Sequence, residues 1–87
     1  MKRVRFTPHA REKFVLLASY GCTVRRSQVL KVLSAPERVE TGHRGRRVAQ
    51  GPLDCHRVLR VVFEERENEI VVVTFYPGRR TRYESSI

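Results

Sequence analysis

The stretch at 57–77, RVLRVVFEERENEIVVVTFYP, decides the fold. Its two halves are rich in β-branched and aromatic residues, and the polar residues 66–68 separate them. We therefore predict a hairpin of strands over residues 56–65 and 69–76, with Asn68 in the left-handed third position of a three-residue loop. The predicted register sets Glu65 opposite Glu69, Phe63 opposite Val71, Val61 opposite Val73, and Leu59 opposite Phe75, which makes one face apolar.

The other face of this hairpin carries polar groups that suit a ligand. In the predicted register Arg60 lies opposite Thr74 and one diagonal step from Tyr76, and His56 shares its face. An antiparallel sheet commonly leaves one polar face to water, so these residues need no ligand. Several apolar residues also remain on this face, however, and they favour a partner.

The residues before the hairpin predict a short strand and a helix. Residues 3–6 alternate so that Val4 and Phe6 face the core and the arginines between them face away. Thr7 is the expected N-cap of a helix over residues 8–20. The apolar residues of this helix repeat at helical spacing, at Ala10, Phe14, Leu17 and Ala18.

A second helix is predicted over residues 25–34, after Gly21 has ended the first one in a left-handed conformation. Thr23 is its expected cap. Its predicted apolar face consists of Val29, Leu30 and Leu33. Arg25 and Arg26 lie at the positive end of the helix dipole, where acidic residues are favoured, and this indicates either tolerated strain or a docking position for an anion.

The remaining segments complete an α+β domain. Strands are expected at 39–41 and 46–50, with turns at 42–45 and 51–54, and residues 77–87 are expected to form a basic tail. The predicted order is β-α-α-β-β-β-β, an antiparallel sheet with two helices packed on one face, in a single domain that takes up the whole chain.

The composition favours a polyanionic partner. The formal net charge is +9, and arginine supplies fifteen of the eighteen basic residues. Its forked guanidinium matches phosphate, which points to RNA, although a solubilising arginine coat would have the same composition. No apolar run is long enough to span a membrane, and Arg11, Glu12 and Lys13 interrupt the N-terminal segment where a signal peptide would lie, so we expect a cytoplasmic protein. Cys22 and Cys55 lack the close spacing of zinc ligands, so we expect reduced, half-buried thiols, no metal and no cofactor.

The segment FTPHA at 6–10 resembles the "FTxHA" start of a group of small bacterial domains with the fold of the RelE/ParE toxins. The likeness continues through 21–32 and the closing hairpin, and it covers nearly the whole chain. Arg25, Arg26 and Ser27 depart from the family pattern of a cap and acidic residues. The resemblance implies the toxin of a toxin–antitoxin pair, commonly a metal-independent endoribonuclease that cleaves mRNA, often on the ribosome, with an acidic antitoxin as its partner.

Candidate catalytic residues can be named from the chemistry of RNA cleavage through the ribose 2′-hydroxyl. This reaction needs a base, an acid and a cation that holds the charge on phosphorus oxygens. His9 or His56 is predicted to transfer the proton, Arg60 with Arg47 to hold the phosphate, and Tyr76 to orient the group or assist the proton transfer.

Further arginines are predicted to bind nucleic acid. Arg3 and Arg5 are expected on the helix-free side of the sheet, and Arg47 joins them if Val48 is the buried member of its strand. A C-terminal basic segment adds Arg79, Arg80 and Arg82. Of three classes of function we favour an RNA-cleaving toxin. A non-catalytic RNA- or ribosome-binding module and a ParE-like inhibitor of a protein target such as DNA gyrase stay open as alternatives.

Overall fold

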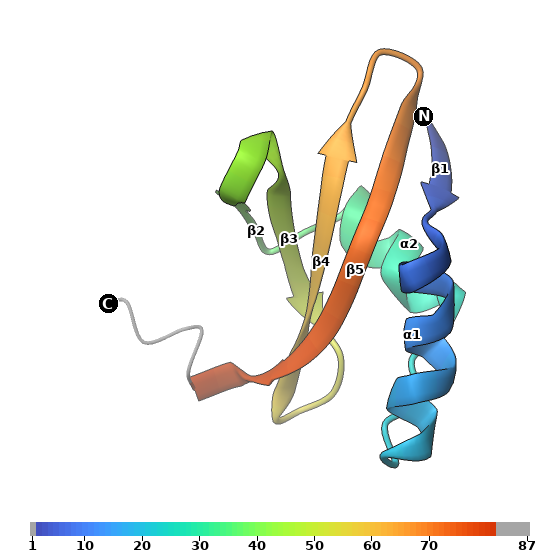
Figure 1. Cartoon of the computed structure of the whole chain (residues 1–87). Coiled ribbons are helices and arrows are strands. Elements are labelled where there is room, and N and C mark those ends of the chain that lie inside the picture. The colour runs from blue at the N-terminus through green and yellow to red at the C-terminus, as the bar shows by residue number, and fades with distance from the viewer. Residues whose placement is uncertain (1, 82–87) are drawn as a thin grey trace.

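One five-stranded sheet organises the structure, a computed structural model that describes residues 2–81 (Figure 1). Its elements in chain order are β1 (Arg3–Phe6), α1 (Pro8–Ser19), α2 (Arg26–Ser34), β2 (Arg38–Thr41), a 3-10 turn (His43–Gly45), β3 (Arg47–Pro52), β4 (Arg57–Glu65) and β5 (Glu69–Arg79). The strands lie in the order β1-β5-β4-β3-β2. The α+β class and the element order are therefore confirmed. Strands β2 to β5 are antiparallel as predicted, whereas β1 runs parallel to β5 and makes the sheet mixed.

The first strand and its link to α1 follow the sequence pattern closely. Val4 and Phe6 lie beside core residues of β5, so the predicted direction of their side chains is confirmed. Thr7 caps α1, since its Oγ1 accepts a hydrogen bond of 3.1 Å from the Ala10 N–H. Gly21 takes a φ of +82°, which is the predicted left-handed stop.

The core lies between the sheet and the two helices. Figure 1 shows α2 behind the sheet and α1 beside β5, below the end of β1. Phe14 of α1 packs on Phe75 of β5, with ring centroids 4.6 Å apart. Val32 of α2 lies so close to Gly51 of β3 that a Cβ at Gly51 would be 2.8 Å from the Val32 Cγ2. Glycine at this position therefore sets the distance between α2 and the sheet.

The α2 helix differs from the prediction at its start and on its buried face. Arg25, not Thr23, is the N-cap, and its N–H donates a hydrogen bond of 2.7 Å to Gln28 Oε1. Glutamine thus fills the position of the glutamate in a capping box. Val32 is buried in place of Leu30, which is exposed. In α1, Ala18 is likewise exposed rather than part of the core.

The predicted register of the β4–β5 hairpin is wrong. Glu65 lies opposite Ile70, and a β-bulge between Val62 and Phe63 shifts the pairing again, so that Arg60 lies opposite Tyr76. None of the predicted opposite pairs, including Phe63 with Val71, Val61 with Val73 and Leu59 with Phe75, is formed. The extra residue of the bulge lets Val72 and Phe75 both face the core. Among residues 2–81 only Gly21, Arg44 and Gly45 have a left-handed φ, so Asn68 does not.

Two strands are longer than predicted. Gly51 and Pro52 belong to β3 instead of a turn, and β5 continues to Arg79. The expected tail at 77–87 therefore starts too early, and 82–87 lies outside the described residues. His56, by contrast, precedes β4 by one residue. Within the described part of the chain, neither helix has the length and apolar composition needed to cross a bilayer.

Candidate functional site

Arg60 and Tyr76 meet on the helix-free face of the sheet, as predicted, although they are direct partners and not diagonal ones. Arg60 Nε donates to Tyr76 Oη at 3.1 Å. Its Nη1 donates to Gln50 Oε1 at 2.6 Å, and its Nη2 to Glu40 Oε1 at 3.0 Å. The residue is only 6% exposed. The guanidinium is thus bonded to three side chains of β2, β3 and β5.

The charge of Arg60 is balanced inside the protein. Burial by itself lowers the pKa of its guanidinium, but the hydrogen bonds to Glu40 and Tyr76 outweigh burial and raise it. In return, the hydrogen bond from Arg60 is the main reason why the pKa of Glu40 is lowered. A guanidinium bonded in this way has few donors to offer a phosphate. Its predicted role as a phosphate clamp stays a prediction, and this geometry does not favour it.

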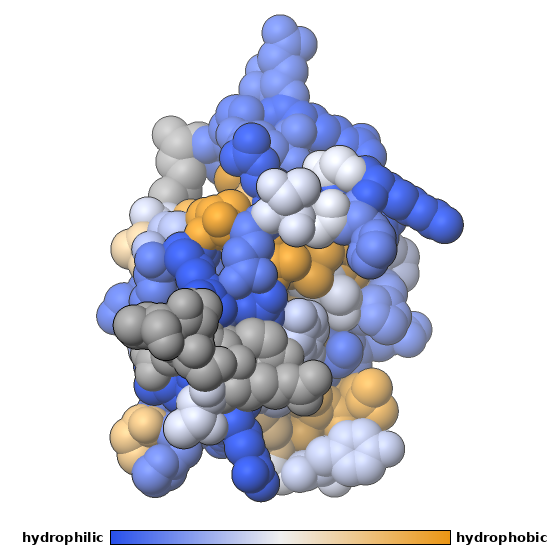
Figure 2. Space-filling model, turned by 90° about the vertical axis from the view of Figure 1, so that its left-hand side faces the viewer, coloured by the Kyte–Doolittle hydropathy of each residue, from blue (hydrophilic) through white to orange (hydrophobic). Residues whose placement is uncertain are grey.

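The apolar residues of the helix-free face are not left open as expected. Val58 and Val71 are buried, and Val62 is half-buried. Figure 2 shows the side of the molecule that carries β2, where hydrophilic residues cover most of the surface and apolar patches are small. Val58 and Val71 therefore expose almost no apolar surface that a partner could cover, and they give no support to the predicted partner at this face.

His56 lies at the other end of β4 from the hairpin loop, in a hollow with Asp54, Arg57, Arg79 and Thr81. It is exposed and is four residues from Arg60, which is about 13 Å along a strand. Asp54 accepts hydrogen bonds from Arg57 Nε at 2.8 Å and from the His56 N–H at 2.9 Å. These bonds, with the Arg57 side chain first, lower the pKa of Asp54. The structure thus places His56 beside Arg79 instead of beside Arg60.

The other predicted proton-transfer residue, His9, lies elsewhere. It is the second residue of α1, is exposed, and lines a different hollow with Glu12, Lys13 and Leu16. The four predicted catalytic residues are therefore divided among three places, and only Arg60 and Tyr76 are in contact.

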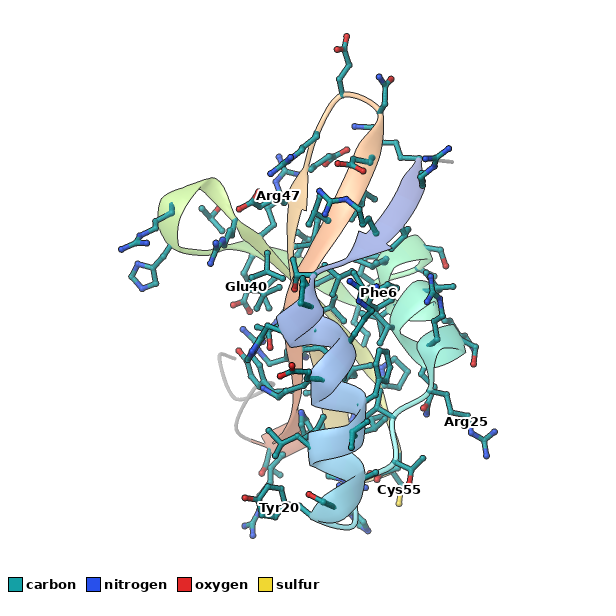
Figure 3. The ribbon with its side chains drawn as sticks, turned by 45° about the vertical axis from the view of Figure 1, so that its right-hand side comes forward. Phe6, Tyr20, Arg25, Glu40, Arg47 and Cys55 are labelled. Carbon is teal, nitrogen blue, oxygen red and sulfur yellow. The ribbon has the colours of Figure 1, made fainter. Side chains whose placement is uncertain are left out.

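A second group of arginines lines one hollow beside β1: Arg3, Arg5, Arg11 and Arg26, here called the β1 arginine cluster. The Arg26 guanidinium lies 4.6 Å from the centroid of the Phe6 ring, which is typical of a cation–π contact. Figure 3 shows Phe6 near the start of α1 and beside α2. Three elements of the fold thus contribute arginines to the lining of this hollow.

Ion pairs balance only part of the charge of this cluster. Arg5 pairs with Glu69 at 3.2 Å, whereas Arg3, Arg11 and Arg26 form no ion pair within residues 2–81. Nine acidic residues are present in the sequence, and eight of them lie in the described part. Six of these eight pair with cations, and those six are Glu37, Glu40, Asp54, Glu64, Glu65 and Glu69. Arg3 also lies opposite Glu69, and its charge helps to lower the pKa of that carboxyl, so only Arg11 and Arg26 of the cluster show no such interaction with the acids of residues 2–81.

Sequence reasoning placed part of this cluster. Arg3 and Arg5 lie on the helix-free side of β1, as predicted. Arg26 was singled out by its position at the positive end of α2, and Arg25, which Figure 3 shows extending away from the molecule, lies next to it. Arg11 was missed, because a lone arginine in an exposed helical turn gives no signal.

The other predicted nucleic-acid-binding residues are dispersed. Ala49 is buried in the core, so by strand alternation Arg47 lies on the helix side of the sheet and the expectation for Val48 is wrong. Arg47 lies 3.6 Å from Glu65, near the β4–β5 loop (Figure 3). Arg80 pairs with Glu37 at 3.2 Å. Arg82 lies outside the described residues.

The cysteines have different surroundings. Cys22 is buried and accepts a hydrogen bond of 3.4 Å from Arg57 Nη1, while Cys55 is exposed, and both are free thiols. The expectation that both are half-buried is therefore wrong. Across 2–81, no three His, Cys, Asp or Glu residues are grouped so that they could hold a metal ion.

Comparison of the chain with models of protein families, with curated proteins and with solved structures gave no match. The resemblance to RelE/ParE toxins therefore stays a prediction, and the function has to be inferred from the arrangement of the residues.

Proposed function

We propose that this chain is a non-catalytic RNA-binding module whose contact surface is the β1 arginine cluster. The observation that supports it best is that four arginines line one hollow and that two of them, Arg11 and Arg26, have no acidic partner in the described part of the chain. Guanidinium groups form paired hydrogen bonds with phosphate oxygens. An unbalanced group of them is therefore a surface on which an RNA backbone releases counterions.

The fold supports this proposal by limiting how far the cations can move. Arg3 and Arg5 stand on a strand that is paired with β5 along its length. Arg26 is held over the Phe6 ring, and Arg11 stands on the first turns of a capped helix. Cations that are already positioned lose less conformational entropy when a phosphate binds.

Salt-dependent binding tests the proposal. The affinity for a single-stranded RNA should fall with salt, and each of Arg3→Gln, Arg11→Gln and Arg26→Gln should weaken it. Each should also reduce the slope of log K against log salt by about 0.7 for every phosphate that the variant no longer binds. Lys31→Gln removes the same charge from the last turn of α2 and is the matched control, because Lys31 is exposed and does not line the hollow of the cluster. An equal decrease in affinity for Lys31→Gln would show that only net charge matters and would refute a defined site.

A second candidate, RNA cleavage, is favoured by the hollow that holds His56, Arg57 and Arg79. There the imidazole would take the proton from a ribose 2′-hydroxyl, whose oxygen would then attack phosphorus. The departing 5′-oxygen would gain a proton from water, giving a 2′,3′-cyclic phosphate and a 5′-hydroxyl end. Arg79 would hold the charged phosphoryl oxygens, since it forms no ion pair among the described residues.

Cleavage and binding are separable by experiment. Purified protein is incubated with RNA and with ribosomes, and the product ends are identified. Under the cleavage proposal His56→Ala abolishes product and leaves RNA binding intact, while His43→Ala, which changes an exposed histidine in the 3-10 turn, leaves both unchanged. Product that persists in His56→Ala would point to a contaminating nuclease and remove this candidate.

An acidic antitoxin and a ParE-like action on a protein target rest on the family resemblance alone. An acidic protein partner would compete with RNA for the β1 arginine cluster, because both ligands need the same guanidinium groups. A gene for a small acidic protein beside the gene for this chain would support the antitoxin. Its absence would weaken the toxin proposal.

A further inference from the structure

The turn between β2 and β3 projects from the sheet and has an unusual backbone. Figures 1 and 3 show it at the edge of the sheet that is remote from α1. Within residues 2–81, Arg44 is the one residue other than glycine that has a left-handed φ, at +58°. The next residue, Gly45, has a φ of +76°. Two successive left-handed residues thus form the tip of the turn.

An arginine in this conformation lowers the stability of the turn. The Cβ of a left-handed L-residue lies too close to the following carbonyl oxygen, and glycine avoids this contact. Gly45 follows this rule, whereas Arg44 does not. A backbone outlier of this kind is a reason to seek a function for its side chain. A coat of solubilising charges gives no such reason, because the other arginines of residues 2–81 have no left-handed φ.

The charge at the tip of the turn has no acidic partner, whereas the charges at its base do. Arg46 Nε lies 3.1 Å from Glu64 Oε2, and Arg47 Nη1 lies 3.6 Å from Glu65 Oε1. Arg44 is exposed and forms no ion pair in the part of the chain that the structure describes. The guanidinium of Arg44 is therefore available to an anion from outside.

Hydrogen bonds hold the turn in shape. The Gly42 N–H donates to the Arg46 carbonyl oxygen at 2.7 Å, and the Arg46 N–H donates to the His43 carbonyl oxygen at 3.0 Å. A Cβ at Gly42 would lie 3.2 Å from the Arg46 carbonyl oxygen, so the chain closes tightly here. The backbone of Arg44 is thus positioned before a ligand binds, which lowers the entropic cost of a contact.

We propose that the β2–β3 turn is a second phosphate contact, and that RNA bound at the β1 arginine cluster continues across the end of the sheet to Arg44. The forked guanidinium of arginine matches phosphate oxygens, as it does in the first cluster. This inference rests on the proposed RNA binding and adds a second site to it. Two linked contacts strengthen binding only if one RNA can reach both.

The strand register places the two contacts at the same end of the sheet. Arg3 pairs with Glu69 at the start of β5, and Arg47 pairs with Phe63 close to the end of β4. Both positions are next to the β4–β5 loop, as Figure 1 shows. β1 and β2 are the two edges of the sheet, and four strand spacings separate them by about 19 Å. At about 3.4 Å per nucleotide, an RNA strand needs at least about six nucleotides to reach from one edge to the other.

A comparison of two RNA lengths tests the second contact. Arg44→Gly should weaken the binding of a single-stranded RNA of about 16 nucleotides by about fivefold or more, because one of two linked contacts is lost. An RNA of about four nucleotides is too short to reach both contacts. Its affinity for the β1 arginine cluster, followed by the amide NMR signal of Val4, should therefore be unchanged in Arg44→Gly. Arg26→Gln should weaken the binding of both RNAs.

Stability and charge are controlled by separate measurements. Glycine accepts a positive φ, so Arg44→Gly should unfold at a urea concentration no lower than that of the wild type, and weaker binding then cannot come from unfolding. Arg44→Lys keeps the charge and should lose less affinity than Arg44→Gly. Lys31→Gln removes an exposed charge that belongs to neither contact, and it should bind the longer RNA more tightly than Arg44→Gly does.

The outcomes separate the second contact from the first. Unchanged binding of the longer RNA by Arg44→Gly would overturn the second contact, and the β1 arginine cluster would stand as long as Arg26→Gln is impaired. Equal losses in Lys31→Gln and Arg44→Gly would reduce the effect to net charge and would overturn it as well. If neither Arg44→Gly nor Arg26→Gln weakens binding, the proposed function itself fails.

Discussion

Replacing Arg60 by alanine should destabilise the fold, because this guanidinium holds three strands together. Gln50 is 2% exposed and would lose the donor to its Oε1, which costs about 1–2 kcal/mol for a buried acceptor. Glu40 would lose its ion pair, but its side chain is 40% exposed and water can replace the partner, so we add at most about 1 kcal/mol. The free energy of unfolding should therefore fall by about 2–3 kcal/mol.

Urea unfolding followed by circular dichroism measures this decrease. A domain of this size has an m-value of about 1 kcal/mol per molar urea, so the midpoint should fall by about 2–3 M. Arg3→Ala is the control, because Arg3 is exposed and forms no ion pair within residues 2–81, and it should change stability by less than about 0.5 kcal/mol. If the two variants unfold at the same urea concentration, Arg60 is not a structural group and the argument for its internal role fails.

Three further changes test the packing, the helix cap and the charge network. Gly51→Ala should cost about 1–3 kcal/mol in thermal or urea unfolding, because its Cβ would meet Val32, and it should cost less when Val32→Ala makes room. Thr7→Ala should cost about 1 kcal/mol by the same measurement, because the Ala10 N–H would have no acceptor from the cap, and a change within error would contradict the cap. Because the pKa of Glu40 is lowered in the folded protein, its contribution is present above its ordinary pKa of about 4.3 and is lost as pH falls through the lower folded value. Wild type should therefore exceed Glu40→Gln in stability at pH 7, and the difference should shrink as pH falls below about 4.3, whereas a constant difference would exclude titration of Glu40 as its cause.

The order and class of the elements could be predicted because local patterns determine them. The sequence marks both ends of α1. Thr7 and Pro8 indicate its start, and Gly21, which has a positive φ in the structure, indicates its end. The register of the final hairpin could not be predicted in this way. The bulge at Val62 and Phe63 leaves alternation intact on either side of it, so no single residue announces it.

The candidate site was less accessible to prediction, because it depends on contacts between distant segments. Alternation correctly put Arg60 and Tyr76 on one face. It could not show that Glu40 and Gln50, from two other strands, would bond the same guanidinium. The β1 arginine cluster likewise combines β1 with the starts of α1 and α2, and only tertiary structure brings Arg26 onto Phe6.

The parallel pairing of β1 with β5 also constrains how the chain can fold. Arg3 pairs with Glu69, 66 positions further on, and closing a loop of that length costs about 4 kcal/mol of chain entropy beyond a constant. The antiparallel strands β2 to β5 are joined by short connections and can assemble earlier. We therefore expect β1 to dock late in folding, after β5 has been synthesised, and until then Val4 and Phe6 would be accessible to chaperones.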